Sequence, residues 1–238
     1  MLGVELAARF ALPPNILSYC GTKSFLPAFK SFLKHKRLFC RPLELQLMKF
    51  RAHYSYLRLI AKENGLQPFD LKVCEAFWIG NSLLSNVKKE SVREMILHDF
   101  CAPGFLSRKQ AEKLVLDLPE QIFPHHSFHV FFIRSISGKL PSSLKTADLC
   151  RISWGKVLKK KEDLLYVDSQ KIVKDKLGFR LVPTKKAWKL KCKDVSIGQN
   201  IKVGDLVASH WNFAVVKISA AQQRYLKFFT IQNLNYLR

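Results

Sequence analysis

The sequence predicts an α+β fold, with a helical N-terminal region followed by a small OB-like β-barrel and a C-terminal helix. Up to about residue 118, apolar side chains recur at the spacing of three and four that is typical of amphipathic helices. From residue 151 to 218, short alternating runs are separated by charged or Gly-containing turns, as in small barrels. We therefore expect two domains, a mostly helical one over residues 1–140 that ends in a strand and a barrel over 148–238.

Four helices are expected in the N-terminal region. The first spans residues 42–64, the second begins at Asp70 as its N-cap, and the third follows Ser91. The fourth covers residues 107–118, with Ser107 as its N-cap.

After Pro124 the helical spacing of apolar residues gives way to a continuous apolar and aromatic run. The apolar and aromatic run in PHHSFHVFFIRSISG is interpreted as a buried strand, and KLPSSLKTAD as a linker. A terminal helix is expected from Ser219, with Gln222 in the capping-box position. The barrel strands are expected within 151–161, 163–173, 179–191 and 201–219.

Charge, cysteine content and hydropathy indicate which binding partners and which cellular compartment to expect. The net charge of +22 suggests nucleic acid or an anionic membrane surface, but the basic residues are spread over both halves of the chain. The six cysteines form no CxxC pair, which indicates reduced thiols and a cytoplasmic protein. Because no apolar stretch reaches about 18 residues, we expect neither export nor a membrane-spanning segment.

Cys150 and His210 are the first candidate site, interpreted as a metal-binding pair. A thiolate and a neutral imidazole together suit iron, zinc or copper. Two protein ligands leave coordination positions open for other ligands or for a partner, which favours a carrier over a closed structural site.

A second metal or substrate site could form from Cys20, His125, His126 and His129. On a strand, His125 and His129 would share one face, whereas His126 and His129 would point to opposite faces. On a turn that enters the strand after Pro124, several of these histidines could instead converge with Cys20. Glu75 and Asn81 could then orient these ligands as hydrogen-bond acceptors. The alternative interpretation is two exposed histidines and one core histidine.

Two other functions stay open at this point. In a Cys/His-dependent hydrolase, Cys20 or Cys150 would be the nucleophile and a histidine its base, although neither cysteine lies in a known catalytic motif. In a nucleic-acid-binding OB-like protein of basic character, a stacking surface would form from Trp154, Trp188 and Trp211 with Lys185 and Lys186. The lysines at 159–161 are better explained as a solvated turn.

Two segments of the barrel resemble a known family. CRISWGKV at 150–157 and GDLVASHWNFAVVKI at 204–218 are similar to the two ends of the HypC/HupF family of hydrogenase assembly chaperones. The sequence departs from that pattern at Trp154, where the family has proline, and at Asn212, where it usually has glycine. In addition, Cys150 is internal, whereas the family's cysteine follows the initiator methionine.

This resemblance implies a function and a site. The chain would be an accessory or chaperone protein in nickel–iron hydrogenase maturation, and not an enzyme. Its cargo would be iron carrying cyanide and carbonyl ligands, held by the Cys150 thiolate and the His210 imidazole. Its partners would be the hydrogenase large-subunit precursor or other maturation factors. The whole chain also resembles an uncharacterised bacterial and archaeal family through RFALPPNILSYCG, PHHSFHVF and CRISWGKV.

Overall fold

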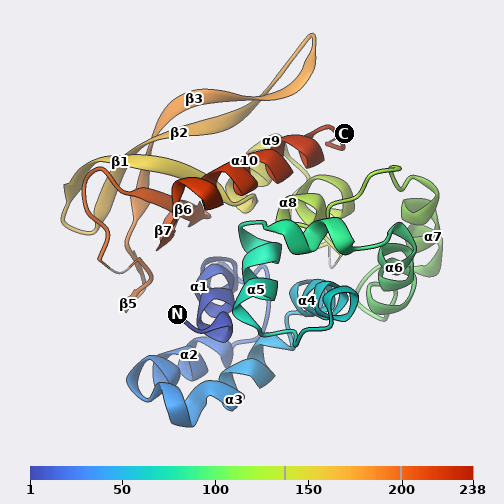
Figure 1. Cartoon of the computed structure of the whole chain (residues 1–238), viewed down its shortest axis with the longest axis horizontal. Helices are drawn as coiled ribbons and strands as arrows, with labels where there is room; N and C mark the ends of the chain where they lie inside the picture. The colour runs from blue at the N-terminus through green and yellow to red at the C-terminus, as the bar shows by residue number, and fades with distance from the viewer. Residues whose placement is uncertain (137, 199, 238) are drawn as a thin grey trace.

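A computed structural model describes residues 1–136, 138–198 and 200–237 and confirms the α+β fold (Figure 1). The helical part precedes the barrel in the chain, and one long helix follows the barrel. Its helices and single turns are α1 (Gly3–Ile16), α2 (Phe25–Lys34), α3 (Lys36–Leu47), α4 (Arg51–Asn64), α5 (Leu71–Trp78), η1 (Ser82–Asn86), α6 (Lys89–Glu94), η2 (Met95–Asp99), α7 (Arg108–Leu116), α8 (His126–Phe128), η3 (His129–Ile133) and α9 (Leu144–Cys150).

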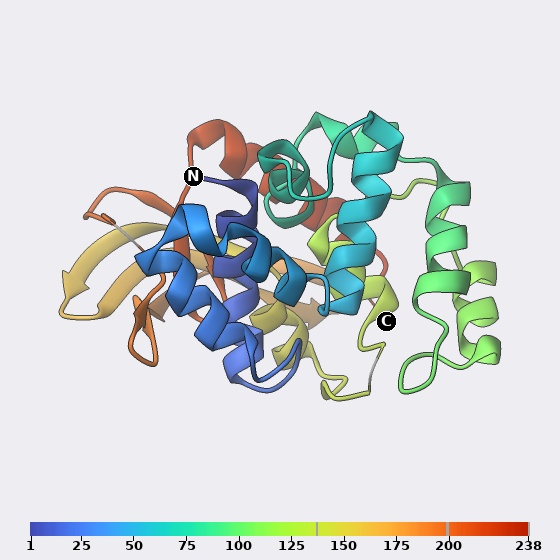
Figure 2. The same ribbon diagram turned by 90° about the horizontal axis from the view of Figure 1, so that it is seen from below.

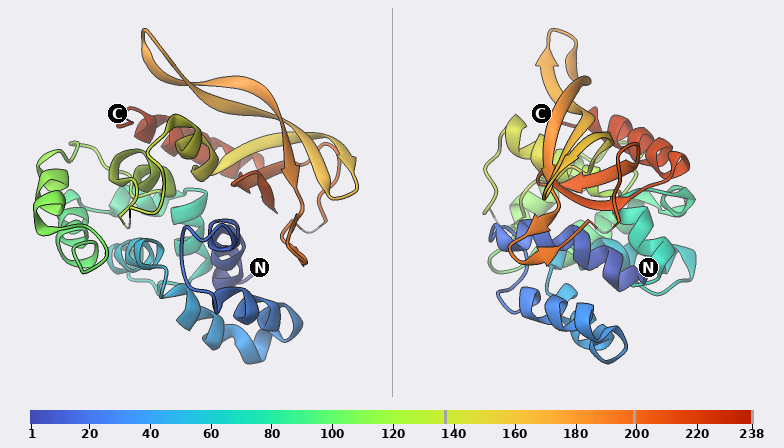
Figure 3. Two further views of the ribbon diagram at one scale, coloured as in Figure 1. Left: turned by 180° about the vertical axis from the view of Figure 1, so that it is seen from behind. Right: turned by 90° about the vertical axis from the view of Figure 1, so that its left-hand side faces the viewer.

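Five strands close into a barrel in the order β1-β2-β3-β7-β6. Leu165, Val167 and Trp188 are among the buried side chains that fill its interior. The β2–β3 hairpin is longer than the barrel needs, and its end projects away from the body of the molecule (Figure 3). The strands and the last helix are β1 (Ser153–Lys161), β2 (Leu164–Asp175), β3 (Gly178–Lys189), β4 (Lys191–Cys192), β5 (Val195–Ser196), β6 (Leu206–His210), β7 (Phe213–Lys217) and α10 (Ala220–Leu234).

Helix α1 lies at the centre of the molecule. Every residue from Gly3 to Pro14 is buried, including Glu5 and Arg9, so this helix is enclosed on all sides. It contacts α2, α3 and α5 on one side and β6 and β7 on the other. Seen from below, the helices lie in front of the barrel (Figure 2).

The two expected domains share one hydrophobic core. The largest cluster of buried side chains runs from Val4 in α1 to Phe229 in α10. Polar contacts cross the same boundary: the buried guanidinium of Arg9 donates to the carbonyl of Ile197 and pairs with Glu5 at 2.8 Å. In the part of the chain that the structure describes, no helix is long and apolar enough to cross a membrane.

The expected strand in residues 124–138 is wrong, because residues 126–133 form α8 and η3. The histidine at 125 acts as the N-cap, with Nδ1 accepting a hydrogen bond of 3.1 Å from the backbone N–H of Ser127. Phe128 and Phe132 then stack at helical spacing, with ring centroids 5.1 Å apart. A short apolar run does not distinguish a strand from a buried helix by its periodicity.

Three other predictions differ from the structure. The third helix, expected after Ser91, begins at Lys89 as α6. The helix expected over 42–64 is broken before Arg51 into α3 and α4, and the ring of Phe50 packs edge-on against Phe25, 4.8 Å away. The expected linker contains α9, for which Ser143 is the N-cap. The predicted capping box at Ser219 is present, and Ser107, predicted as an N-cap, also forms a capping box with Gln110.

Candidate metal centre

Three buried side chains converge between the helical part and the barrel. Cys150, His126 and His210 each offer one ligand atom, and these atoms all lie within 4.8 Å of one another. Ligands of a tetrahedral zinc or iron ion are about 3.3–3.6 Å apart, given bonds of about 2.0–2.3 Å. Small side-chain rotations would therefore bring the three atoms onto one ion.

A main-chain carbonyl fixes the proton on His210. Nδ1 of His210 lies 2.7 Å from the carbonyl oxygen of Phe10, and since a carbonyl only accepts, Nδ1 must carry the proton. This carbonyl cannot accept the usual helical hydrogen bond from four residues later, because Pro14 lacks an N–H. Nε2 is thereby left with its lone pair, and it has no hydrogen-bond partner among the described residues.

An ionic network ties the helix that carries Cys150 to the barrel. Asp148 accepts from the buried Arg151 at 2.9 Å, from Lys186 at 2.9 Å and from the backbone N–H of Ile172 at 3.1 Å. Desolvation acts to raise the pKa of Asp148, but the charges of Arg151 and Lys186 outweigh it and hold the pKa below its usual range. Cys150, the last residue of α9, is placed by this network.

Hydrogen bonds from α10 hold the helix that carries His126. The side-chain amide of Asn233 donates to Ser127 Oγ at 2.9 Å and to the carbonyl of Phe123 at 3.2 Å. The ring of His126 lies 5.1 Å from that of His210, nearly at right angles to it. Nδ1 of His126 is buried and unpartnered within the residues that the structure describes.

Burial keeps both histidines neutral. Desolvation lowers the pKa of His210 to about 4, and it lowers the pKa of His126 well below its ordinary value, with repulsion from His210 adding to the effect. Each ring therefore retains a free lone pair at neutral pH. Desolvation also raises the pKa of the Cys150 thiol, so a bound metal would have to displace its proton.

Aromatic rings pack against the two histidines of the cluster. The ring of Trp78, the last residue of α5, lies 4.7 Å from that of His126 and 5.6 Å from that of His210. On its other side it packs against Phe10 and His53. His53, which the sequence analysis missed, is buried, and burial lowers its pKa to about 3. The sequence feature that could have identified His53 as a buried residue is its position on the apolar face of α4.

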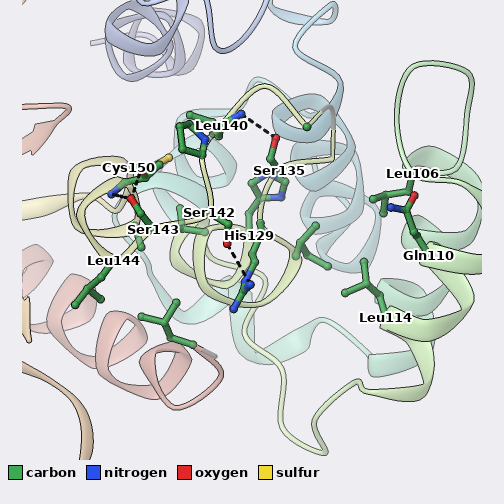
Figure 4. A pocket seen from close by; sticks show the side chains of 18 of the residues that line it. Leu106, Gln110, Leu114, His129, Ser135, Leu140, Ser142, Ser143, Leu144 and Cys150 are labelled. Atoms are coloured by element: carbon green, nitrogen blue, oxygen red, sulfur yellow. Dashed lines mark hydrogen bonds between the residues drawn. The ribbon is translucent and has the colours of Figure 1, made fainter. Parts of the chain in front are cut away.

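A cavity of about 680 Å³ is lined in part by Cys150 (Figure 4). The wall is mainly apolar, with Leu140 and Leu144 near the thiol and Leu114 of α7 at the far end. Cys150 lines this space, and 9% of the surface of the residue is exposed.

The predicted second site is divided in the structure. His126 joins Cys150 and His210, whereas His125 serves as the N-cap of α8. His129 faces Tyr56 and Phe100, with ring centroids 5.6 and 5.9 Å away.

The remaining predicted residues lie elsewhere. Cys20 lies in an exposed turn after α1. Glu75 and Asn81 do not orient the histidines: Glu75 accepts from Gln222, and Asn81 donates to the carbonyl of Lys72 and caps η1.

The stacking surface expected for nucleic acid is not formed. Trp154, Trp188 and Trp211 are all buried, and Trp188 fills the barrel interior. Lys186 is paired with Asp148, which leaves Lys185 as the exposed member of that lysine pair. The indole rings are consequently part of the packing and cannot stack on bases.

Comparison with known sequences identifies a family that matches this chain. The sequence model of a group described as "Family of unknown function (DUF6390)" matches residues 1–238, so the match includes both the helical part and the barrel. No curated protein and no solved structure matches the chain.

Proposed function

The chain belongs to the DUF6390 family, whose function is unknown, and we propose from the geometry of its site that it is a metal carrier in nickel–iron hydrogenase maturation. In this proposal Cys150, His126 and His210 hold an iron centre, which is the cargo. The protein passes that centre to the hydrogenase large-subunit precursor or to another maturation factor.

The convergence of three buried donor groups carries the proposal. Two of them are imidazoles kept neutral by burial, and the tautomer of His210 is set by the Phe10 carbonyl. A buried polar atom without a partner is costly, and a metal ion would satisfy Nε2 of His210 and the thiol together. Three protein ligands leave at least one coordination position for exchange, as a carrier requires.

The two segments that resemble the HypC/HupF family support the same function. They form neighbouring parts of the barrel, since β1 pairs with β6 and β6 pairs with β7. Gly204, with φ of 90°, makes the turn before β6, and Asn212 adopts the positive φ at the position where that family usually has glycine. The departure at Asn212 therefore preserves the backbone geometry.

The site suits metal binding better than nucleophilic catalysis. A catalytic cysteine acts as a thiolate, which is usually stabilised by a protonated histidine or another cation. Here burial raises the pKa of the Cys150 thiol and lowers the pKa of His210 to about 4, so both groups are neutral. A divalent metal supplies the positive charge that this arrangement lacks.

The cavity beside Cys150 is large enough to accommodate the additional ligands of a bound iron centre. An iron fragment with cyanide and carbonyl ligands needs an apolar volume next to the protein ligands. The wall near the thiol consists largely of Leu140, Leu144 and Ala147, and the space of about 680 Å³ continues toward α7. The acceptor protein could reach the metal by the same route.

The proposal is tested by anaerobic purification followed by metal analysis and infrared spectroscopy in the cyanide and carbonyl region. We expect bound iron, or uptake of Fe²⁺, in the wild type and its loss in Cys150→Ser, His126→Ala and His210→Ala. Cys74→Ser is the matched control, because Cys74 is also buried but lies in α5 outside the cluster. Equal metal content in all five proteins would contradict the proposal.

The partner is tested separately. A tagged hydrogenase large-subunit precursor should retain the wild-type chain, and Cys150→Ser should weaken this association. Retention that is unaffected by metal and by Cys150→Ser would argue for docking without transfer of a metal.

A further inference from the structure

The cavity that Cys150 lines extends to a region with no part in the metal cluster. Its volume of about 680 Å³ lies within the range of about 300–1,000 Å³ that is usual for sites of small organic ligands. Neither His126 nor His210 lines it, whereas Gln110 and Leu114 of α7 do. Cys150 and α7 lie on opposite sides of the space (Figure 4). The cavity therefore has room for a ligand other than the metal.

Two helices supply much of the apolar wall. One face of α7 borders the cavity, because its lining residues recur at helical spacing, at positions 110, 113 and 114. Leu144 and Ala147 of α9 line the other side at the same spacing. Ile133 of η3 and Phe179 of β3 add to this surface. An apolar wall of this kind favours the burial of a hydrocarbon chain.

The wall between η3 and α9 includes an unusual backbone conformation. Arg134 has φ of 65° and ψ of −145°, values that glycine adopts far more easily than other residues. Its guanidinium donates to Ser142 Oγ at 3.3 Å, and the N–H of Leu140 donates to Ser135 Oγ at 3.4 Å (Figure 4). All four residues line the cavity. Strained residues held in this way are found at ligand sites more than elsewhere.

The charged side chains around the cavity are mostly cationic. Among the described residues that line it, the cations are Lys113, Arg134 and Lys174, and the carboxylate is Asp117. Because Lys113 and Asp117 lie one helical turn apart, their charges offset each other. The ammonium of Lys174 lies 5.3 Å from the centre of the Phe179 ring, which is part of the wall. A cation next to an apolar surface complements an anion that is attached to a hydrocarbon chain.

We propose that the cavity binds a carboxylate with an unbranched hydrocarbon chain, with the chain between α7 and α9 and the carboxylate beside Lys174. The apolar walls account for the chain, and the excess of cations accounts for the charge. This inference goes beyond metal binding and does not depend on it, because of the three metal ligands only Cys150 borders the cavity.

Calorimetric titration of the full chain with hexanoate, octanoate and decanoate at pH 7 tests the site of the chain. Each additional CH₂ group should tighten binding about fourfold, because it moves into apolar surroundings. Leu114→Trp and Leu144→Trp, which fill the cavity from its two sides, should weaken decanoate binding about tenfold or more, since at least two CH₂ groups lose their place. Leu116→Trp is the matched control, because Leu116 also lies in α7 but is 86% exposed.

The role of the charge is tested with 1-octanol, which has the chain of octanoate without the negative charge. Lys174→Met keeps the length of the side chain and removes its cation. It should weaken octanoate binding up to about fivefold, as for a partly exposed ion pair, and leave 1-octanol binding unchanged. Lys176→Met is the control, since Lys176 is exposed at the turn of the same hairpin and does not line the cavity.

Three results would overturn the inference. The first is no binding of decanoate, and the second is binding that neither Leu114→Trp nor Leu144→Trp weakens, which would place the ligand elsewhere on this basic protein. The third is an equal effect of Lys174→Met on octanoate and on 1-octanol, which would leave the charge without a role. Circular dichroism of each variant establishes that a loss of binding does not reflect unfolding.

Metal binding is measured separately by anaerobic titration with Co²⁺, a spectroscopic substitute for Fe²⁺. Cys150→Ser should lose Co²⁺ binding and keep decanoate binding, whereas Leu114→Trp should lose decanoate binding and keep Co²⁺ binding. Failure of one proposal is thereby distinguished from failure of the other.

Discussion

The main-chain carbonyl of Phe10 accepts a hydrogen bond of 2.7 Å from Nδ1 of His210. The carbonyl is free because Pro14 supplies no N–H four residues later in α1. The N–H that Pro14 lacks in the first helix thus determines which nitrogen of His210, 200 residues away from Phe10, is available to a metal. The same helix end carries the turn that holds Cys20.

Pro14→Ala should weaken metal binding about tenfold, because loss of an outer hydrogen bond to a ligating histidine costs about 10–100-fold in affinity. The new N–H would compete for the Phe10 carbonyl and loosen the orientation of His210. Pro13→Ala is the matched control, since its new N–H would face the carbonyl of Arg9. Competition titration with a chelating dye measures both, and an equal effect of the two substitutions would contradict the argument.

Local patterns predicted much of this fold. The barrel strands follow from alternation, as in β2, where Leu165 and Val167 are buried and Tyr166 and Asp168 are exposed. The capping box at Ser219 needs only residues close to it in the chain. Elements whose deciding contacts are local were therefore predictable.

The prediction of a strand at residues 124–138 was wrong because the contact that decides the conformation there comes from a residue distant in the sequence. The helical turn there is stabilised by Asn233, whose side chain donates to Ser127 Oγ from 106 residues away. A continuous apolar run carries no period that could reveal this contact.

The candidate site was predictable in part. Cys150 and His210 were found from the segments around them, and the structure brings them together. His126 was predicted as part of a second site with Cys20, His125 and His129, whereas the structure places it beside Cys150 and His210. His53 could have been found because it shares the apolar stripe of α4 with Tyr56 and Leu57.

The free energy of unfolding should fall steeply as the pH drops below about 6.5. In the unfolded chain each imidazole takes up a proton near pH 6.5, whereas the buried rings stay neutral to much lower pH. The unfolded state then binds more protons, which costs up to about 1.4 kcal/mol per pH unit for each histidine. Burial lowers the pKa to about 3 for His53 and His125 and to about 4 for His129 and His210, and well below the ordinary value for His126.

Urea unfolding at steps between pH 7.5 and about 4.5 measures this slope. His53→Leu should reduce the slope of the free energy of unfolding against pH by the contribution of one histidine. No hydrogen bond is lost in this variant, because both nitrogens of His53 lack partners among the described residues. His98→Ala is the control, because His98 is exposed and pairs with Glu94. A free energy of unfolding that is constant over this range would show that the rings are not buried as neutral groups.

Asp148→Ala should destabilise the protein by about 3–5 kcal/mol, because it leaves the guanidinium of Arg151 buried without its counter-ion. Asp175→Ala is the control: Asp175 pairs with Arg180 on the exposed hairpin, where an ion pair contributes about 0–1 kcal/mol. Urea unfolding at pH 7 compares them. Since Asp148 also places α9, its loss should weaken Co²⁺ binding, and similar stabilities for the two variants would contradict the assignment.

The turn between β6 and β7 should tolerate glycine but not alanine at position 212. Trp211 and Asn212 have φ values of 53° and 61°, as in the two-residue turns of type I′, and His210 pairs directly with Phe213 across the turn. A left-handed conformation costs about 1–2 kcal/mol for an ordinary residue, which asparagine partly avoids and glycine avoids altogether. Asn212→Ala should therefore lower the melting temperature by about 2–4 °C per kcal/mol lost, whereas Asn212→Gly should leave it nearly unchanged.

Because the turn fixes the register of His210, Asn212→Ala should also weaken Co²⁺ binding. If Asn212→Gly proved as damaging as Asn212→Ala, the asparagine side chain, and not its backbone conformation, would be what the hairpin requires.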